Sequence, residues 1–171
     1  MEQLPFEGSL SYFETQKILK DENMIFHVWN DTIVFACRYA RRAYHVINES
    51  CFAGKLPGAF IGFYDPEDAD DLGFGAESRA SYYCGAIGFN LAFCPCDKIE
   101  TISILSHEMV HQYCDLQRIT DCIDAYHTES FKKIAESIGL NCLYCDEIYG
   151  FNITRVTENF ITSLKTPPDK I

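Results

Sequence analysis

The sequence predicts an α+β domain in which a small antiparallel or mixed sheet packs on three to four helices. Three features support this prediction. Apolar residues recur at helical spacing over residues 31–49 and again after Pro95, and the segments 59–64 and 86–90 are rich in aromatic and β-favouring residues. The chain has 171 residues, 47% of them apolar, which suits one domain with a sizeable core.

The first predicted helix covers residues 31–49. Asp31 is a favourable N-cap for it. Apolar residues then recur at intervals of four and three: Ile33, Cys37, Ala40, Tyr44 and Ile47. Residues 24–29, just before this helix, fit a strand as well as a helix. The helix is expected to end within residues 48–54, before a turn at Leu56-Pro57-Gly58.

The central predicted helix begins near Asp97, which is followed three residues later by Glu100 in a capping-box pattern. Its expected buried face consists of Ile99, Ile102, Leu105, Met109 and Tyr113. A third, shorter helix is expected from about 128 to 138, with Gly139 as its C-terminal stop.

The central helix carries the motif His107-Glu108-Met109-Val110-His111, which has the pattern H-E-x-x-H. His107 and His111 are one helical turn apart, so their imidazoles project the same way and can bind one metal ion. Glu108 lies beside them and can act as a general base toward a metal-activated water. The motif therefore predicts a zinc hydrolase.

A catalytic zinc ion takes three protein ligands and keeps a fourth position open. His127, sixteen residues after His111, is the expected third ligand. The carboxylates Asp121, Asp124 and Glu129 are alternatives, and Glu129 is the strongest of them because the short helix can present either it or His127.

The charge balance is strongly acidic, with 25 Asp and Glu against 14 Lys and Arg and a formal net charge of −11. A nucleic-acid interface is normally basic, so the composition does not favour one. No apolar run is long enough to cross a membrane, and the first residues lack the basic start and long apolar stretch expected of a signal peptide, so we do not expect one. We therefore expect a cytoplasmic protein.

The nine cysteines are expected to be reduced and mostly buried, given that cytoplasmic setting. Cys142 and Cys145 form the single Cys-x-x-Cys pair, which could bind a second zinc ion together with Cys94 and Cys96. We expect them to be packing residues instead, and one catalytic zinc ion to be the only cofactor.

Two further segments strengthen the metal-site interpretation. His127 is followed by Phe131, and Asn48, Phe52 and Leu56-Pro57 form the pattern N-x-x-x-F-x-x-x-L-P upstream of the first strand. Together with H-E-x-x-H, these segments resemble the SprT-like family of zinc metalloproteases. The resemblance covers roughly residues 30–140.

The resemblance implies a compact zincin fold of the minigluzincin type, with His107, His111 and His127 on zinc and Glu108 as the base. It also implies a zinc-dependent endopeptidase acting on a protein or peptide substrate, with nucleic acid as a further partner in some members. The implied organisation is an N-terminal extension (1–30), a metalloprotease core (31–140) and a C-terminal extension (141–171) without a complete zinc ribbon.

Three other residues are candidates for supporting roles. Asp115, one turn after His111, is expected to orient that histidine. Tyr113 and Tyr126 are candidate donors to the oxyanion that forms during hydrolysis. The alternative function is a non-catalytic zinc-binding module whose acidic surface engages a basic partner. The oligomeric state does not follow from the sequence.

Overall fold

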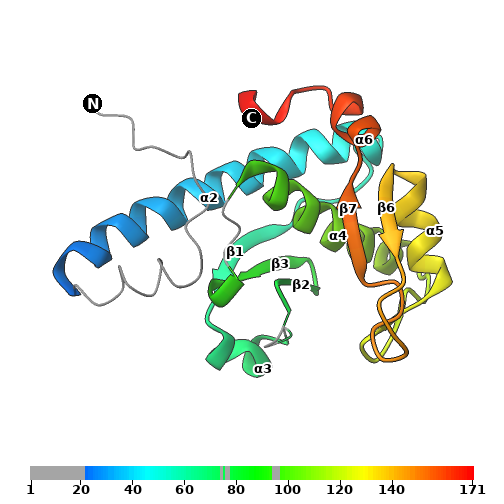
Figure 1. Ribbon diagram of the computed structural model, residues 1–171, viewed down its shortest axis with the longest axis horizontal. Coiled ribbons are helices and arrows are strands. Elements are labelled where there is room, and N and C mark those ends of the chain that lie inside the picture. The colour runs from blue at the N-terminus through cyan, green and yellow to red at the C-terminus, as the bar shows by residue number, and fades with distance from the viewer. Residues whose placement is uncertain (1–21, 74, 76–77, 94–96) are drawn as a thin grey trace.

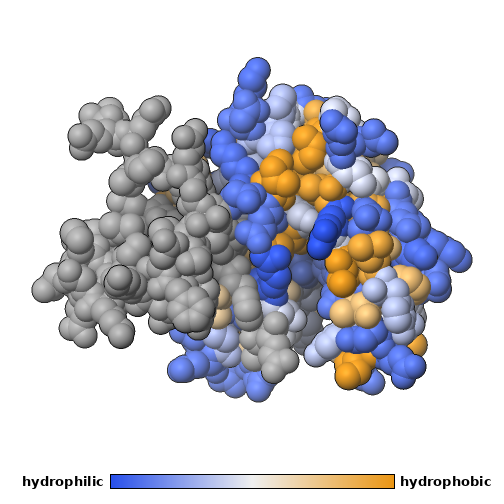
Figure 2. All heavy atoms as spheres, viewed as in Figure 1, coloured by the Kyte–Doolittle hydropathy of each residue, from blue (hydrophilic) through white to orange (hydrophobic). Residues whose placement is uncertain are grey.

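The computed structural model describes residues 22–73, 75, 78–93 and 97–171, and within them the chain has a small α+β fold. Helix α2 runs along the molecule, a three-stranded sheet lies beside its middle, and α5 with β6 and β7 lies near one end (Figure 1). Hydrophilic and hydrophobic residues are interspersed over the described part of the face in Figure 2. The described part has no helix of the length and apolarity that a membrane crossing requires.

Helix α2 (Glu22–Cys51) contains the predicted helix 31–49 and begins earlier. Asp31 therefore lies inside the helix, and its prediction as an N-cap was wrong. The ambiguous residues 24–29 are helical because nothing in Glu22–Cys51 is Gly or Pro, and each added residue extends the hydrogen-bonded ladder. The helix buries one stripe of side chains: Tyr39, Ala40, Ala43, Tyr44 and Ile47.

The main sheet has the order β1-β3-β2 and is mixed. Strand β1 (Phe60–Tyr64) pairs in parallel with β3 (Ala86–Asn90), and β2 (Ala80–Tyr83) pairs with β3 in antiparallel fashion. Both predicted strands are confirmed. The acidic segment between β1 and β2 folds into a 3-10 turn (Pro66–Asp68) and the short helix α3 (Ala69–Leu72).

Helix α4 (Lys98–Gln117) carries the motif and follows a second 3-10 turn (Leu91–Phe93). Asp97 caps it as predicted, with the Glu100 amide donating to the Asp97 carboxylate over 2.7 Å. Ile102, Leu105 and Met109 are fully buried, as expected. Ile99 is 43% exposed, so its assignment to the core was wrong; it stands in the first turn, before the helix reaches the core.

The chain after α4 forms two small antiparallel sheets and two helices. Strands β4 (Cys122–Ile123) and β5 (Tyr126–His127) form a hairpin. Helix α5 (Glu129–Ser137) confirms the short predicted helix and ends before Gly139, whose φ is +93°. The remaining elements are β6 (Leu140–Leu143), β7 (Ile153–Val156), α6 (Glu158–Ser163) and a 3-10 turn (Pro168–Lys170).

The side chain of Asn48 organises the segment that ends at Leu56-Pro57. Its amide nitrogen donates to the carbonyl of Leu56 (2.9 Å), and its amide oxygen accepts from the Leu56 N–H (3.1 Å). Phe52 and Leu56 are both buried. The side chain of Asn48 thus fixes the chain that connects α2 to β1.

Replacing Asn48 with Ala is expected to lower the free energy of unfolding by about 2–4 kcal/mol, because two buried backbone groups lose their partner. Denaturant unfolding followed by circular dichroism measures the change. The matched control is Asn141→Ala, at an exposed position of β6, for which we expect a change within about 0.5 kcal/mol. Equal losses in the two variants would contradict this role for Asn48.

Candidate metal centre

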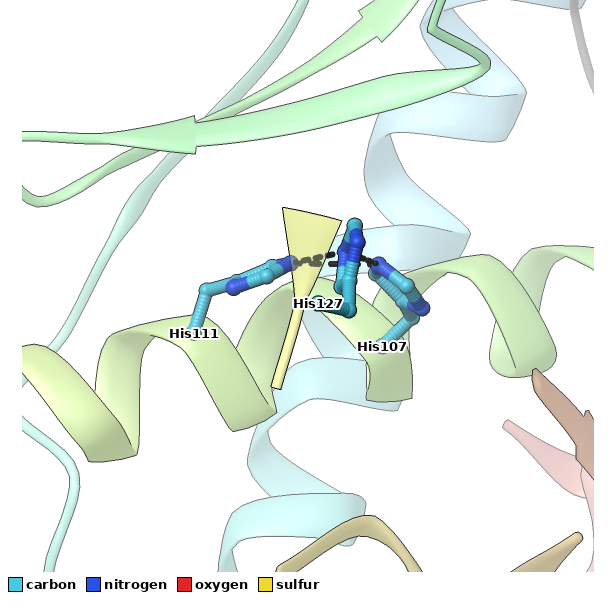
Figure 3. A group of neighbouring side chains, drawn as sticks. All are labelled: His107, His111 and His127. Carbon is cyan, nitrogen blue, oxygen red and sulfur yellow. Dashed lines mark hydrogen bonds between the residues drawn. The ribbon is translucent and has the colours of Figure 1, made fainter. Parts of the chain in front are cut away.

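Three imidazoles converge on one point. His107 and His111 rise from α4, and His127 approaches from β5 (Figure 3). The Nε2 atom of His107 lies 3.1 Å from that of His111 and 3.2 Å from that of His127, and the remaining pair is 3.2 Å apart. The structure therefore brings together the two histidines of the motif and the expected third one.

Mutual hydrogen bonds do not account for this triangle. Each Nε2 atom carries either one proton or one lone pair, so it either donates or accepts. Three such atoms in contact always include one pair of two donors or two acceptors. A cation at the centre accepts all three lone pairs at once, so the group can hold a metal ion.

The opposite ring nitrogens of His111 and His127 have acceptors as partners. His111 Nδ1 donates to the Asp121 carboxylate over 2.6 Å, and His127 Nδ1 donates to the carbonyl of Tyr149 over 3.2 Å. A proton on Nδ1 leaves the Nε2 lone pair free to bind a metal. Both hydrogen bonds thus select the metal-binding tautomer.

His107 makes the equivalent contact with the second small sheet. Its Nδ1 lies 3.0 Å from the hydroxyl of Thr154 on β7. The backbone carbonyl of Thr154 in turn faces the hydroxyl of Ser103 on α4, 3.4 Å away. Strand β7 is thereby joined to the motif helix beside its first histidine.

Asp115 does not orient His111. Its carboxylate accepts a hydrogen bond from the Tyr82 hydroxyl over 2.8 Å, because the end of α4 lies against β2. Asp121, in the segment between α4 and β4, takes the position beside His111. From the sequence, Asp121 is expected only as an alternative metal ligand, because helical spacing does not show how the segment after α4 folds back toward His111.

Phe131 forms an apolar floor beneath the group. Its ring centroid lies 4.8 Å from those of His107 and His111 and 4.7 Å from that of His127, and the side chain is fully buried. Thr128 caps α5 by accepting from the Phe131 amide, which fixes the start of the helix below the imidazoles. Phe131 limits rotation of all three rings and excludes water from one side.

The segment 145–151 holds His127 in place. The His127 amide donates to the Tyr149 carbonyl (3.0 Å), and the Phe151 amide donates to the His127 carbonyl (3.1 Å). Gly150 passes so close that an added Cβ would lie 2.3 Å from the His127 carbonyl oxygen, and its φ is +61°. The short distance between this residue and the His127 backbone requires glycine. No periodicity in the sequence indicates that requirement.

Glu108 is 5% exposed and lies on the β2 side of α4. Burial raises the pKa of its carboxyl to about 7, while the charge of His111 and a hydrogen bond from the Tyr82 backbone act in the opposite direction. A pKa near neutrality suits a group that accepts a proton and then releases it.

Burial also shifts the pKa values of the histidines. It lowers the pKa of His107 well below its ordinary value and that of His127 to about 4, and charge on His111 adds to both shifts. Burial is the largest single influence on His111 and lowers its pKa, but hydrogen bonds to Asp121 and Cys122 and the charge of Glu108 together outweigh burial and raise that pKa to about 10. A cation that binds all three Nε2 atoms therefore displaces one proton, from His111.

The other candidate ligands lie elsewhere. Glu129 is exposed in the first turn of α5 and does not belong to the three-histidine group, and Asp124 is exposed in the hairpin turn. Asp121 and Cys122 form a second possible ligand group with His111, which the sequence analysis did not identify.

Tyr113 and Cys142 serve as packing residues, whereas the expectation that Cys145 would do so was wrong because that residue is exposed. Tyr113 packs against Phe52, with ring centroids 5.7 Å apart, on the core side of α4. The Cys142 thiol faces the carbonyl of Phe151, 3.2 Å away, and Cys145 is exposed. The proposed partners of this pair, Cys94 and Cys96, lie outside the described residues.

Comparison with protein families, curated proteins and solved structures found no match to this chain.

Replacing Asp121 with Ala is expected to weaken zinc binding by about 10–100-fold, because His111 loses the group that sets its tautomer and orientation. Competition with a chromophoric chelator measures the affinity. Asp115→Ala is the matched control and should leave the affinity unchanged, since its carboxylate contacts Tyr82. A larger loss in the Asp115 variant would contradict the assignment.

Gly150→Ala is expected to reduce zinc affinity by at least about tenfold, because the new Cβ displaces the His127 backbone. Gly85→Ala is the control: its φ is +84°, but an added Cβ meets nothing within 4 Å. Both variants should lose about 1–2 kcal/mol of stability from backbone strain. Only the Gly150 variant should also lose metal, as measured by metal content after dialysis; equal metal content would contradict the clash.

Proposed function

We propose that this chain is a zinc-dependent endopeptidase with a zincin fold. The observation that carries the proposal is a buried carboxylate, Glu108, next to three convergent imidazoles. The carboxylate has a pKa of about 7, and the imidazoles are those of His107, His111 and His127. A metal site that served structure alone would have no need of a basic group at that position.

Zinc is the metal that this donor set fits best. A tetrahedral centre with zinc–nitrogen bonds of about 2.0–2.1 Å separates its ligand nitrogens by about 3.3 Å. The separations of 3.1–3.2 Å between the three Nε2 atoms match that value. Three neutral imidazoles leave a fourth position open, which is typical of catalytic rather than structural zinc sites.

A zinc ion bound there would supply Lewis-acid chemistry, activating a water molecule and polarising a carbonyl group. Glu108 accepts the proton of the attacking water, and its pKa allows it to pass that proton to the leaving amine. The imidazoles are held in position during proton transfer by their contacts with Asp121, Thr154 and the Tyr149 carbonyl. The result is hydrolysis of a peptide bond.

A peptide substrate is supported by the resemblance to the SprT-like family. The residues that carry that resemblance have structural roles in this chain: Asn48 fixes the α2–β1 connection, and Phe131 forms the floor of the histidine group. The net charge of −11 favours protein over nucleic acid as the partner.

The Glu108→Gln variant tests the proposal. It keeps the shape of the side chain but cannot accept a proton, so we expect zinc to stay bound and peptide hydrolysis to fall by at least about 100-fold. The assay is digestion of unfolded casein by the zinc-loaded protein, followed by mass spectrometry, with metal content measured in parallel.

His107→Ala is the companion variant, which should lose both zinc and activity. Full activity in the Glu108→Gln variant would overturn the mechanism. Zinc binding without hydrolysis by the wild-type protein, on casein and on a random peptide library, would favour the alternative, a non-catalytic zinc-binding module.

A further inference from the structure

The outer face of the three-stranded sheet, away from α4, carries a hollow. Strand register sets Gly62 beside Gly88 at the middle of this face, where neither residue has a side chain to fill it. Phe60, Leu72 and Tyr83 border the hollow, whose volume is about 430 Å³. We call this feature the outer groove. Its volume is within the range of about 300–1,000 Å³ found for ligand-binding pockets.

The groove is apolar and open to solvent. Phe60 is 71% exposed, Tyr83 53% and Leu72 48%. The ring of Phe60 leans over Gly62, where an added Cβ would lie 3.1 Å from it. Three large apolar side chains gathered around one hollow mark a surface that gains free energy when a partner covers it.

One border of the groove is strongly acidic. The segment 65–71, between two groove residues, contains five carboxylates, all exposed: Asp65, Glu67, Asp68, Asp70 and Asp71. Between Lys55 and Lys98 the sequence has a single basic residue, Arg79, and its guanidinium pairs with Glu100. Within this stretch of the described chain the carboxylates therefore outnumber the basic side chains, and Arg41 of α2, which donates to the Ile61 carbonyl over 3.2 Å, is a cation that contacts β1.

We propose that the outer groove is a docking site for a basic segment of another protein, which inserts apolar side chains between Phe60, Leu72 and Tyr83. Lysine or arginine residues of that segment would face the carboxylates of 65–71. A second copy of this chain fits poorly, because its own acidic segment would meet the first.

The outer groove is separate from the histidine group. Alternate residues of a strand face opposite sides of a sheet. Tyr82, next to Tyr83 in β2, reaches Asp115 of α4 and so faces the helix side. The proposal therefore does not rest on the proposed hydrolysis, and each can fail without the other.

The probe is a short fluorescein-labelled peptide of alternating lysine and leucine, titrated with the full chain and followed by fluorescence anisotropy. Peptides of lysine with serine and of glutamate with leucine should bind at least about tenfold more weakly. Raising the salt from about 50 to about 200 mM should weaken binding of the lysine–leucine peptide.

Two double variants locate the site. Phe60→Ser with Leu72→Ser should weaken binding about tenfold, and Asp70→Asn with Asp71→Asn should weaken it several-fold and reduce its salt dependence. All four positions are exposed, so the variants should fold; thermal unfolding checks this.

The matched controls are Ile123→Ser with Ile148→Ser, and Asp124→Asn with Glu147→Gln, all exposed and outside the groove. They should bind as the wild type does. Equal weakening by groove and control variants would overturn the proposal, since the peptide would then respond to net charge or general apolarity. A dimer seen by light scattering and lost in the Phe60/Leu72 variant would also overturn it, because the groove would then bind a second copy.

Discussion

The lone pairs of three imidazoles converge on one point, and this convergence sets what the segments around the histidines must do. Nε2 atoms 3.1–3.2 Å apart cannot satisfy one another, so other groups must hold the rings in that arrangement. Asp121, Thr154 and the Tyr149 carbonyl do so from three separate segments, and Phe131 closes the remaining side. A cation at the centre would relieve this conflict, so metal binding would favour the folded arrangement of these segments.

The same buried environment tunes the base and the ligands together. Burial disfavours charge, so it moves His107 and His127 toward the neutral form that binds metal and moves the Glu108 carboxyl toward neutrality. His111 is the exception because Asp121, Cys122 and Glu108 together favour its protonated form. One apolar site thus yields good metal ligands and a carboxylate that can both take up and release a proton near pH 7.

Local periodicity in the sequence made part of the candidate metal centre predictable. His107, Glu108 and His111 share one helix, so their relation follows from helical geometry alone. Thr154 lies 47 positions after His107 and reaches it through the pairing of β6 with β7. Gly150 lies 23 positions after His127 and reaches it through a tight turn. No pattern in the sequence predicts either contact. The same limit explains the choice of Asp115 over Asp121. The extension of α2 beyond the predicted 31–49 has a local cause instead, since residues 22–30 contain neither Gly nor Pro.

The net charge of −11 bears on both the histidine group and the surface of the protein. Three neutral imidazoles around a divalent cation carry a net positive charge, which a surrounding negative field stabilises at long range. The same field repels polyanions and attracts basic chains. The acidic residues are most closely spaced in the segment 65–71, beside the open face of the sheet. The other face of the sheet packs against α4. In the two proposals, hydrolysis would take place on the α4 side of this sheet and a basic protein would bind on the opposite side, so the two surfaces would not overlap.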